Sequence, residues 1–274
     1  MDKFWKIYRS LIKDRKHNFL LLMKSVIKKL ERPRNENYIR NKKYSLDQYI
    51  MGIIEILSNN ISWRKYNGQI DGRVLNNKHN EFVKLGVYKD LYRINLKKYL
   101  RKSRKKFLKY LSIDSSFIEN KGGINGLGRN IYYKNKKGRK ITAIVDSKGI
   151  PLSVCLSPGN KHDCTIFKEN KNMISKAYNQ NLYYMADKGY DSEEIRNILR
   201  AKGYIPIIPK RKTKKNKRSL KTNQIKIYRK RIIVENTFSW LKRNAKIDKI
   251  YEKTEESYMA LLLLSISILI YKRT

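Results

Sequence analysis

The chain has 274 residues, of which 64 are lysine or arginine and 23 are aspartate or glutamate, giving a formal net charge of +41. This excess indicates a polyanionic partner, with nucleic acid the first expectation and a membrane surface the weaker alternative. The cysteines, Cys155 and Cys164, form no CxxC pattern and the histidines are scattered, which argues against a disulfide scaffold and a zinc site. We therefore expect a nucleic-acid-binding protein of a reducing compartment.

The first stretch of the chain is basic and partly helical in pattern. Apolar residues recur at helical spacing between lysines over residues 3–30, so an amphipathic helix is predicted there. The polar stretch 31–44 has no periodicity and contains a proline, which indicates a linker. Residues 1–44 are therefore expected to be a basic N-terminal helix followed by a linker.

A second helical region is predicted from residue 45 onward. Ser45 and Gln48 match a capping box in front of a helix at about 46–58, and two more helices are predicted up to about residue 106. A small helical domain over 45–106 suits helix-turn-helix-like DNA binding. The alternative is a plain helical cap on the domain that follows.

From residue 107 the pattern changes to alternating strands and helices. The predicted elements are a strand in 107–116, two strands in 140–158, a helix in 164–178, a strand in 181–192, a helix in 192–203, a strand in 204–210, a basic loop in 210–221 and a helix in 228–243. This order indicates an α/β domain with a mixed sheet over 107–274. Asp146, in the turn between two strands, is expected to be solvated.

One strongly apolar run lies near the C-terminal end of the printed sequence. It is "YMALLLLSISILIY", 14 residues long. A helix that spans a bilayer needs about 20 apolar residues. We therefore expect a buried helix here and no membrane partner.

Three acids stand out by their positions. Asp114 and Asp187 end predicted strands, and Glu235 lies on the last long helix of the α/β pattern. Sites in α/β folds lie beyond the carboxyl ends of the strands, so these side chains are expected to converge. Carboxylate oxygens suit Mg²⁺ or Mn²⁺, and two such ions about 3.5–4 Å apart would act on a phosphodiester by in-line displacement.

The segment "YRKRIIVENTFSWLKR" (228–243) surrounds Glu235 with basic and apolar residues. On a helix, Tyr228, Arg231, Glu235 and Lys242 project from one face. The simplest alternative is an Arg231–Glu235 pair on a solvated helix, which stabilises a helix by a few tenths of a kcal/mol.

These residues carry a resemblance to a known family. The segment fits Y-x2-R-x3-E-x6-K and resembles the third motif of DDE insertion-sequence transposases, of the groups named after insertion sequences four and five. "YYMADKGYDS" (183–192) resembles their second motif, and "LSIDSSFIE" (111–119) resembles the first. "NNISWRKYNG" (59–68) resembles their amino-terminal DNA-binding region. The resemblance covers about residues 45–270, in the order of the family.

The resemblance implies a fold, a site and an activity. The fold is an RNase H-like mixed sheet flanked by helices and preceded by the helical DNA-binding domain. The catalytic metal ligands are Asp114, Asp187 and Glu235, holding two Mg²⁺ (or Mn²⁺) ions. The side chains expected to face DNA are Tyr228, Arg231, Lys242, Lys188, Lys210, Arg211, Lys212, Lys214 and Lys215.

The activity implied is cleavage at transposon ends and strand transfer into target DNA, by a homodimer assembled on DNA. It would be located in the bacterial cytoplasm or nucleoid, or in the nucleus or a viral factory. Two alternatives stay open: a transposase-derived protein that only binds DNA, and a metal-dependent nuclease without strand transfer. ATP dependence is not indicated, because "GLG" at 126–128 lacks the third glycine of a dinucleotide loop and no Walker A pattern occurs.

Two parts of the sequence depart from the family pattern. "SSFIENKGGINGLGRN" (115–130) is irregular, and residues 1–44 match nothing in it. His162 and Asp163 lie in a family-like loop, where a supporting role near the metals and a plain loop are equally consistent with the sequence.

Overall fold

The computed structural model describes residues 13–31, 43–59, 61–103, 109–122, 127–174, 182–211, 220–243 and 245–273. The chain forms two units, each described by itself. The first, which we call the sheet unit, comprises Arg101–Asn120 and Gly126–Trp240. The second, which we call the helical unit, comprises Met1–Leu100, Lys121–Asn125 and Leu241–Thr274. The start of the predicted N-terminal helix and most of the predicted linker lie outside the described residues.

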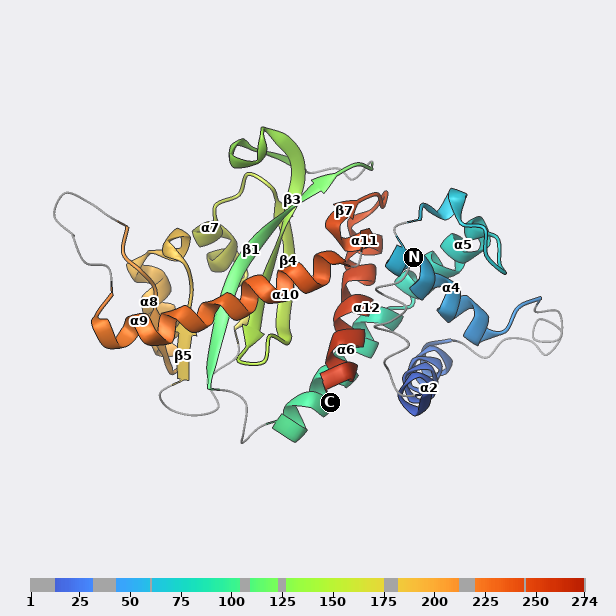
Figure 1. Ribbon diagram of the computed structural model, residues 1–274, viewed down its shortest axis with the longest axis horizontal. Helices are drawn as coiled ribbons and strands as arrows, with labels where there is room; N and C mark the ends of the chain where they lie inside the picture. The colour runs from blue at the N-terminus through green and yellow to red at the C-terminus, as the bar shows by residue number, and fades with distance from the viewer. Residues whose placement is uncertain are drawn as a thin grey trace. The chain divides into compact units, whose positions relative to one another are not determined.

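A mixed sheet forms the centre of the sheet unit (Figure 1). Its strands are β1 (Tyr110–Asn120), β2 (Gly128–Asn130), β3 (Lys136–Asp146), β4 (Pro151–Pro158), β5 (Leu182–Met185) and β6 (Tyr204–Ile207). Their order is β2-β3-β1-β5-β6, with β4 also paired to β3. β3 is antiparallel to β1, β2 and β4, whereas β5 is parallel to both β1 and β6. An antiparallel meander of β1, β3 and β4 continued by two parallel strands is the RNase H-like arrangement, which confirms the predicted fold class.

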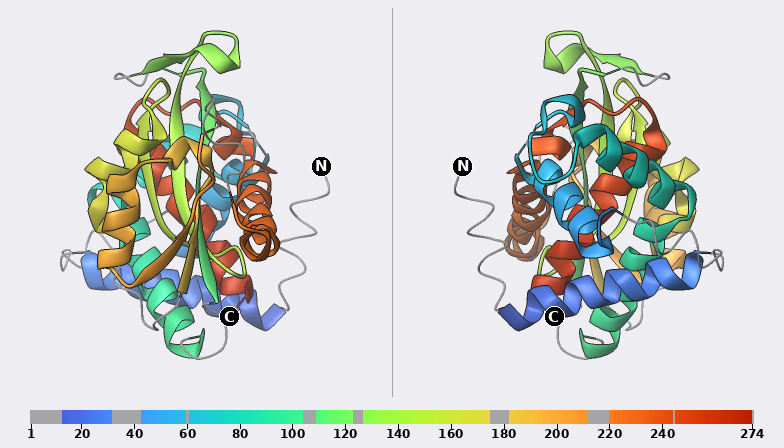
Figure 2. Two further views of the ribbon diagram at one scale, coloured as in Figure 1. Left: turned by 90° about the vertical axis from the view of Figure 1, so that its left-hand side faces the viewer. Right: turned by 90° about the vertical axis from the view of Figure 1, so that its right-hand side faces the viewer.

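Helices cover both faces of this sheet (Figure 2). They are α7 (Asp163–Glu169), α8 (Glu193–Ala201), α9 (Thr222–Tyr228) and α10 (Ile232–Arg243), with 3-10 turns η2 (Ile131–Tyr133), η3 (Lys171–Met173), η4 (Lys188–Tyr190) and η5 (Arg229–Arg231). On the α7 and α8 side the buried core includes Phe167, Tyr184, Ile195 and Leu199. On the other side Thr237 of α10 donates a hydrogen bond to the Gly149 carbonyl (2.9 Å) in the β3–β4 turn.

That turn corrects the prediction that Asp146 is solvated. The Asp146 side chain is fully buried, and its Oδ1 accepts hydrogen bonds from the backbone N–H groups of Lys148 and Ile150, both at 2.9 Å. Gly149 adopts a positive φ of 73°, which glycine reaches without steric cost. The carboxylate therefore holds the turn together, as aspartate does where its side chain bonds the backbone of the following residues.

The helical unit gathers elements from the first hundred and the last thirty or so residues. They are α2 (Lys13–Leu30), α4 (Leu46–Asn59), η1 (Trp63–Lys65), α5 (Gly72–Lys84), α6 (Val87–Ser103, to Leu100 in this unit), α11 (Ala245–Asp248), β7 (Lys249–Ile250) and α12 (Glu255–Arg273). The predicted capping box is confirmed: the Ser45 N–H donates to Gln48 Oε1 (2.7 Å) and the Gln48 N–H to Ser45 Oγ (3.2 Å).

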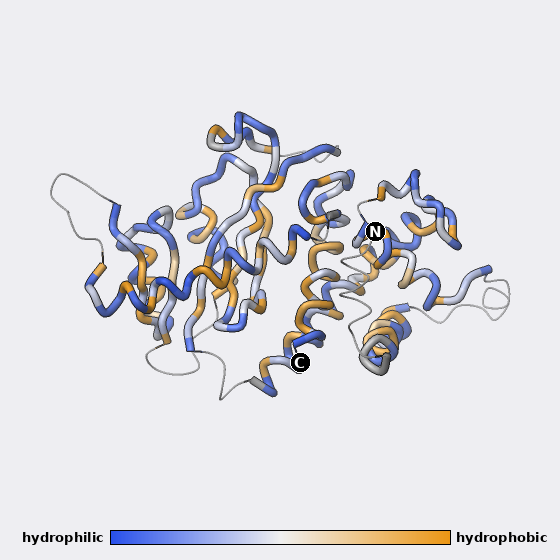
Figure 3. Tube along the Cα trace, in the orientation of Figure 1, coloured by the Kyte–Doolittle hydropathy of each residue, from blue (hydrophilic) through white to orange (hydrophobic). Residues whose placement is uncertain are grey.

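The apolar run near the C-terminal end forms most of α12. This helix is coloured as apolar along most of its length in Figure 3 and packs against α5. Most of its residues from Ser257 to Ile270 are buried, which confirms the prediction of a buried helix. Neither α12 nor any other helix in the described ranges has the length and apolarity needed to cross a bilayer.

A buried polar network ties the helical unit together. Trp63 Nε1 donates to the Glu252 carboxylate, at 3.3 Å from each oxygen, and the Trp63 ring stacks on His79. Ser257 Oγ also donates to Glu252 (3.0 Å), so its single hydrogen is used and His79 Nε2 must donate to it (2.9 Å). Burial disfavours the charged imidazole. In the neutral ring, with its proton on Nε2, Nδ1 accepts from the Tyr88 hydroxyl at 2.8 Å.

The burial of His79 predicts a loss of stability in mild acid. Burial lowers the pKa of His79 to about 4 from 6.5, although the Glu252 carboxylate opposes the shift and Lys246 adds to it. As pH falls from 6.5 to 4, His79 is protonated in the unfolded chain but stays neutral in the folded chain. The free energy of unfolding should therefore fall by up to about 3 kcal/mol. Thermal melts of wild type and His79→Gln over this range measure the effect. The melting temperature of the variant should depend less steeply on pH, and equal slopes would refute the role of His79.

Candidate active site

Asp114 lies in the middle of β1, at the centre of the sheet. It is opposite Ala143 of β3 in the antiparallel register. Its Oδ1 accepts a hydrogen bond from the Ser115 N–H at 2.8 Å. Burial raises the pKa of the Asp114 carboxyl, the Arg231 guanidinium opposes this rise, and the charge of Asp187 adds to it. A carboxylate that is costly to ionise is thus held beside a cation and a second carboxylate.

Asp187 follows β5, the parallel neighbour of β1. The printed register ends with Ser112 opposite Met185. Two further residues along both strands bring Asp114 level with Asp187, which explains the electrostatic coupling of the two carboxylates. Asp187 Oδ1 also accepts from the Gly189 N–H at 2.7 Å, in the η4 turn. The predicted convergence of acids at adjoining strands therefore holds for this pair.

Glu235 approaches this pair through Arg231. The Arg231 guanidinium donates to Asp114 Oδ2 through Nη1 at 2.8 Å and to Glu235 Oε1 through Nη2. The side chain of Arg231 is 16% exposed, that of Asp114 is 20% exposed and that of Glu235 is 52% exposed. Burial lowers the pKa of Arg231, but the ion pair with Asp114 more than offsets this, so the pKa is raised. Arg231 is thus more than the i, i+4 partner of Glu235, because it joins the helix to the sheet.

The carboxylates of this site are a donor set that fits a divalent cation. Within the described ranges, no group of three or more His, Cys, Asp or Glu side chains is placed to hold a metal ion. Asp114 and Glu235 nevertheless converge on one positive charge, the Arg231 guanidinium, and Asp187 lies beside Asp114. Hard carboxylate oxygens around a cationic group are the chemistry that Mg²⁺ and Mn²⁺ require. The Arg231 guanidinium supplies the positive charge between Asp114 and Glu235.

Ser115, the residue after Asp114, belongs to a hydrogen-bond network that the sequence did not predict. Ser115 Oγ hydrogen-bonds to Thr142 Oγ1 (2.8 Å) and to the hydroxyl of buried Tyr190 (3.0 Å). Burial raises the pKa of Tyr190 well above its usual value, and the Asp163 carboxylate adds to the rise. Ser115 and Tyr190 could have been suspected, because each lies within three residues of a candidate acid in a family-like motif. Thr142 lies in no such motif, so nothing in the sequence pointed to it.

Asp163 and Asp187 each place a carboxylate oxygen beside Gly189. A Cβ atom at position 189 would come within 2.8 Å of Asp187 Oδ1 and 3.2 Å of Asp163 Oδ2, so glycine is needed for this approach. Asp163 Oδ1 pairs with Lys140 Nζ at 3.0 Å. His162 is the residue before α7 and its side chain makes no capping hydrogen bond.

The two other residues of the Y-x2-R-x3-E-x6-K pattern, Tyr228 and Lys242, belong to different units. Tyr228 ends α9, where the Arg231 guanidinium lies 5.8 Å from its ring centre and burial raises the pKa of its hydroxyl. Lys242, two turns beyond Glu235 on α10, belongs to the helical unit. Burial lowers the pKa of Lys242, opposed by Asp248. The predicted single helix over 228–243 is helical throughout but tightens to a 3-10 turn at Arg229–Arg231.

The other predicted DNA-facing residues are basic and follow strand ends. Lys188, Lys210 and Arg211 are exposed. Arg211 is held near η4, since its backbone N–H donates to Asp191 Oδ2 at 2.8 Å. Lys212, Lys214 and Lys215 lie outside the described residues.

Fold and acids together define a class of protein. An RNase H-like sheet with one aspartate on its central strand, a second just after the adjoining parallel strand, and a glutamate on a following helix suits metal-assisted chemistry on phosphodiesters. The model of the transposase DDE domain family matches residues 105–270, more than half of the chain. The chain therefore belongs to the transposase DDE domain family.

Similar proteins carry the same kind of name. The chain is 26% identical over 142 residues to a transposase for insertion sequence element IS402 of Burkholderia cepacia, covering 49% of this chain and 64% of that protein. It is 29% identical over 124 residues to a transposase for element IS6501 of Brucella ovis, covering 44% of this chain and 88% of that protein. The match thus spans less than two thirds of the IS402 relative. These similarities confirm the predicted resemblance to insertion-sequence transposases.

A solved structure was also found by comparison of folds. It is the Mos1 mariner paired end complex with Mn, which covers 81% of this chain and 82% of its own at 11% identity, with a TM-score of 0.27. A TM-score at this level does not by itself establish a shared fold.

Proposed function

We propose that the protein is a DNA transposase that cuts at the ends of its element and joins the freed 3′ hydroxyl to target DNA. The observation that carries the proposal is the meeting of Asp114 and Glu235, which are far apart in the sequence, on one guanidinium beside Asp187. All of these residues lie inside the region matched by the transposase family. A packing role alone would not require Asp114 in the central strand to share a cation with one acid and lie beside another.

The proposed reaction is a hydrolysis that leaves a 5′ phosphate, followed by a transesterification in which one ester bond replaces another. In cleavage, water attacks the phosphorus at the element end, and the bond to the 3′ oxygen breaks to leave a 3′ hydroxyl. In joining, that hydroxyl attacks a target phosphodiester and displaces a 3′ hydroxyl of the target strand. Bound divalent ions would supply charge stabilisation for the attacking and leaving oxygens.

The side chains of this chain would prepare that reaction. Asp114, Asp187 and Glu235 would hold the ions, and the Ser115 N–H keeps one Asp114 oxygen in place. Arg231, once released from the carboxylates, would be free to bind a phosphate through two parallel N–H donors. Positioning a phosphate in line with its attacker accounts for a large part of such catalysis.

A joining assay with labelled element ends and a supercoiled target tests the proposal. Cleavage followed by joined product supports a transposase. Cleavage without joining would indicate a nuclease, and binding without cleavage would indicate a DNA-binding protein derived from a transposase. Sedimentation of the protein with and without end DNA tests the accompanying prediction of a homodimer on DNA.

The helical unit is proposed to recognise the element ends. In the "NNISWRKYNG" segment Trp63 is committed to the buried network, whereas Arg64 and Lys65 are exposed. Arg64→Ser and Lys65→Ser should therefore weaken binding to the element ends by about tenfold, with a smaller loss for unrelated duplex. Competition binding with both duplexes measures the ratio. Equal losses for the two would show that these residues contribute charge only.

A further inference from the structure

An exposed hairpin stands at one end of the sheet unit. β2 and β3 pair from Gly128 opposite Gly138 to Asn130 opposite Lys136, and η2 closes the loop between them. Two contacts hold the loop: buried Asn130, which ends β2, donates to the Gly159 carbonyl at 2.8 Å, and the ring of Tyr133, in η2 itself, stacks on Phe117 of β1 with ring centres 4.7 Å apart. The loop is thus held against the sheet.

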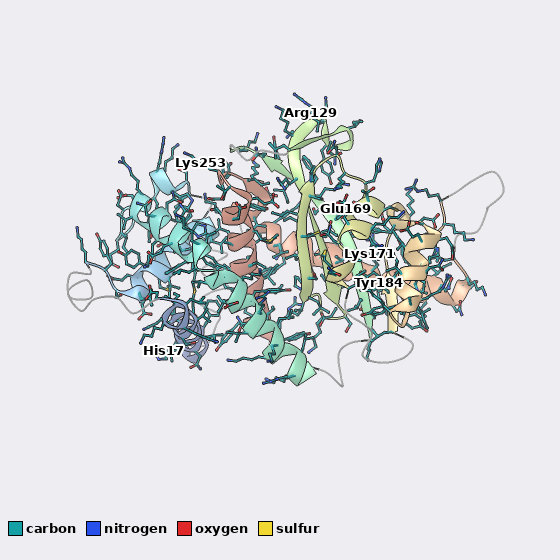
Figure 4. The ribbon with its side chains drawn as sticks, turned by 180° about the vertical axis from the view of Figure 1, so that it is seen from behind. His17, Arg129, Glu169, Lys171, Tyr184 and Lys253 are labelled. Atoms are coloured by element: carbon teal, nitrogen blue, oxygen red, sulfur yellow. The ribbon has the colours of Figure 1, made fainter. Side chains whose placement is uncertain are left out.

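The tip of this hairpin carries cations and an unusually exposed apolar residue. The Ile131 side chain lies in η2, and its residue is 83% exposed, the highest value among the large apolar residues named as exposed in the described ranges. Arg129 of β2, Lys134 of the loop and Lys137 of β3 lie within six residues of it in the same hairpin and are exposed. Figure 4 shows Arg129 at the edge of the sheet unit. In the part of the chain that the structure describes, no acid pairs with Lys134 or Lys137.

Two features of the hairpin are unfavourable in the free protein. Arg129 and Lys137 lie directly opposite each other in the ladder, and like charges in such a pair destabilise a sheet. Lys134 has a φ of 53°, a left-handed conformation that is costly for a residue with a long side chain and free for glycine. A polyanion bound to the tip would reduce the repulsion between Arg129 and Lys137 and would pair with the charge of Lys134.

We propose that this hairpin is a DNA-binding finger, in which Arg129, Lys134 and Lys137 contact phosphates and Ile131 packs against the bases or sugars of a groove. The partner is duplex DNA, because phosphates complement the three cations and apolar side chains wedge against base steps in many DNA complexes. The inference rests on the proposed function in so far as the duplex is the element end or its target.

Charge removal tests the phosphate contacts in the full chain. Lys134→Gly and Lys137→Thr should each weaken binding to a short duplex of arbitrary sequence and lower the slope of log affinity against log salt by about 0.9. Their melting temperatures should stay equal to wild type or rise, because each change removes an unfavourable feature. Lys171→Thr is the matched control, an exposed lysine of η3 in the same unit (Figure 4). Losses no greater than those of the control overturn the proposal.

Ile131→Ser separates apolar contact from charge. It should lower affinity at every salt concentration by several fold and leave the salt slope unchanged, since no phosphate contact is lost. Unchanged affinity overturns the assignment of the tip as a finger that enters a groove. Loss of self-association in sedimentation, with unaltered DNA affinity, overturns the proposal in favour of a protein contact.

The joining assay keeps this inference distinct from the proposed function. If wild type cuts and joins element ends while the hairpin variants bind DNA like the control, the DNA-binding role of the hairpin is wrong and the proposed transposase function is supported. If wild type neither cuts nor joins but the hairpin variants bind duplex DNA more weakly with a lower salt slope, the proposed transposase function is wrong and the DNA-binding role of the hairpin is supported.

Discussion

Asp114→Asn, Asp187→Asn and Glu235→Gln should each reduce cleavage of element ends by at least about 10²–10³-fold, the range seen when one stabilising group is removed from an active site. Each change keeps the shape of the side chain and removes one negative charge from the proposed cation site. Binding of duplex DNA should change little, because the chain keeps a net charge of more than +40. Cleavage rates in Mg²⁺ and duplex affinities, measured on the same preparations, provide the comparison.

Glu194→Gln is the matched control for these variants. Glu194 lies on α8 of the same unit, and its side chain is 52% exposed and pairs with Lys168. It should cleave like wild type. An acid whose variant cleaves as well as this control does not hold an ion, and its assignment would have to be withdrawn.

The sequence predicts the sheet well because its strands are strongly patterned. β3 and β4 are apolar runs on either side of a Lys-Gly turn, and β5 and β6 are short buried strands bounded by loops. The pairing of β1 with β5 then brings Asp114 and Asp187 together. Two of the three acids were therefore predictable from strand order and position alone.

What the sequence could not predict depends on long-range contacts. β2 has only three residues, too few for a local pattern, and its Gly128 lies close to Asn160, which is distant in sequence. Asp146 looks like any turn aspartate until the burial of its carboxylate is known. Ser115 and Thr142 meet across two strands, 27 residues apart.

Arg231 shows the same limit at the candidate site. Its spacing to Glu235 predicts a local pair on a helix, which is present. Its second bond, to Asp114, joins residues 117 positions apart and is visible only in the folded chain. The second bond changes the expected effect of removing the Arg231 side chain, because the mostly buried Asp114 carboxylate would lose its counter-ion.

Arg231→Ala should therefore lower the stability of the metal-free protein by about 1–3 kcal/mol, the usual cost of leaving a buried polar group without its partner, and not by the few tenths expected of a surface pair. Adding Mn²⁺ should raise the melting temperature of the variant more than that of wild type. In wild type an ion must displace the guanidinium from Asp114 and Glu235, whereas in the variant these carboxylates are already free. Thermal melts with and without Mn²⁺ measure both effects.

The same variant should affect DNA cleavage more than DNA binding. Losing one phosphate contact lowers the salt slope by about 0.9, while a misplaced phosphate also loses the in-line geometry of the reaction. Arg231→Lys should recover part of the stability but less of the cleavage, since an ammonium group cannot make two parallel bonds. Arg229→Ala is the control, because Arg229 is an exposed arginine of the same 3-10 turn. If Arg231→Ala matches Arg229→Ala in cleavage, salt slope and response to Mn²⁺, then Arg231 stabilises the fold and takes no part in the reaction.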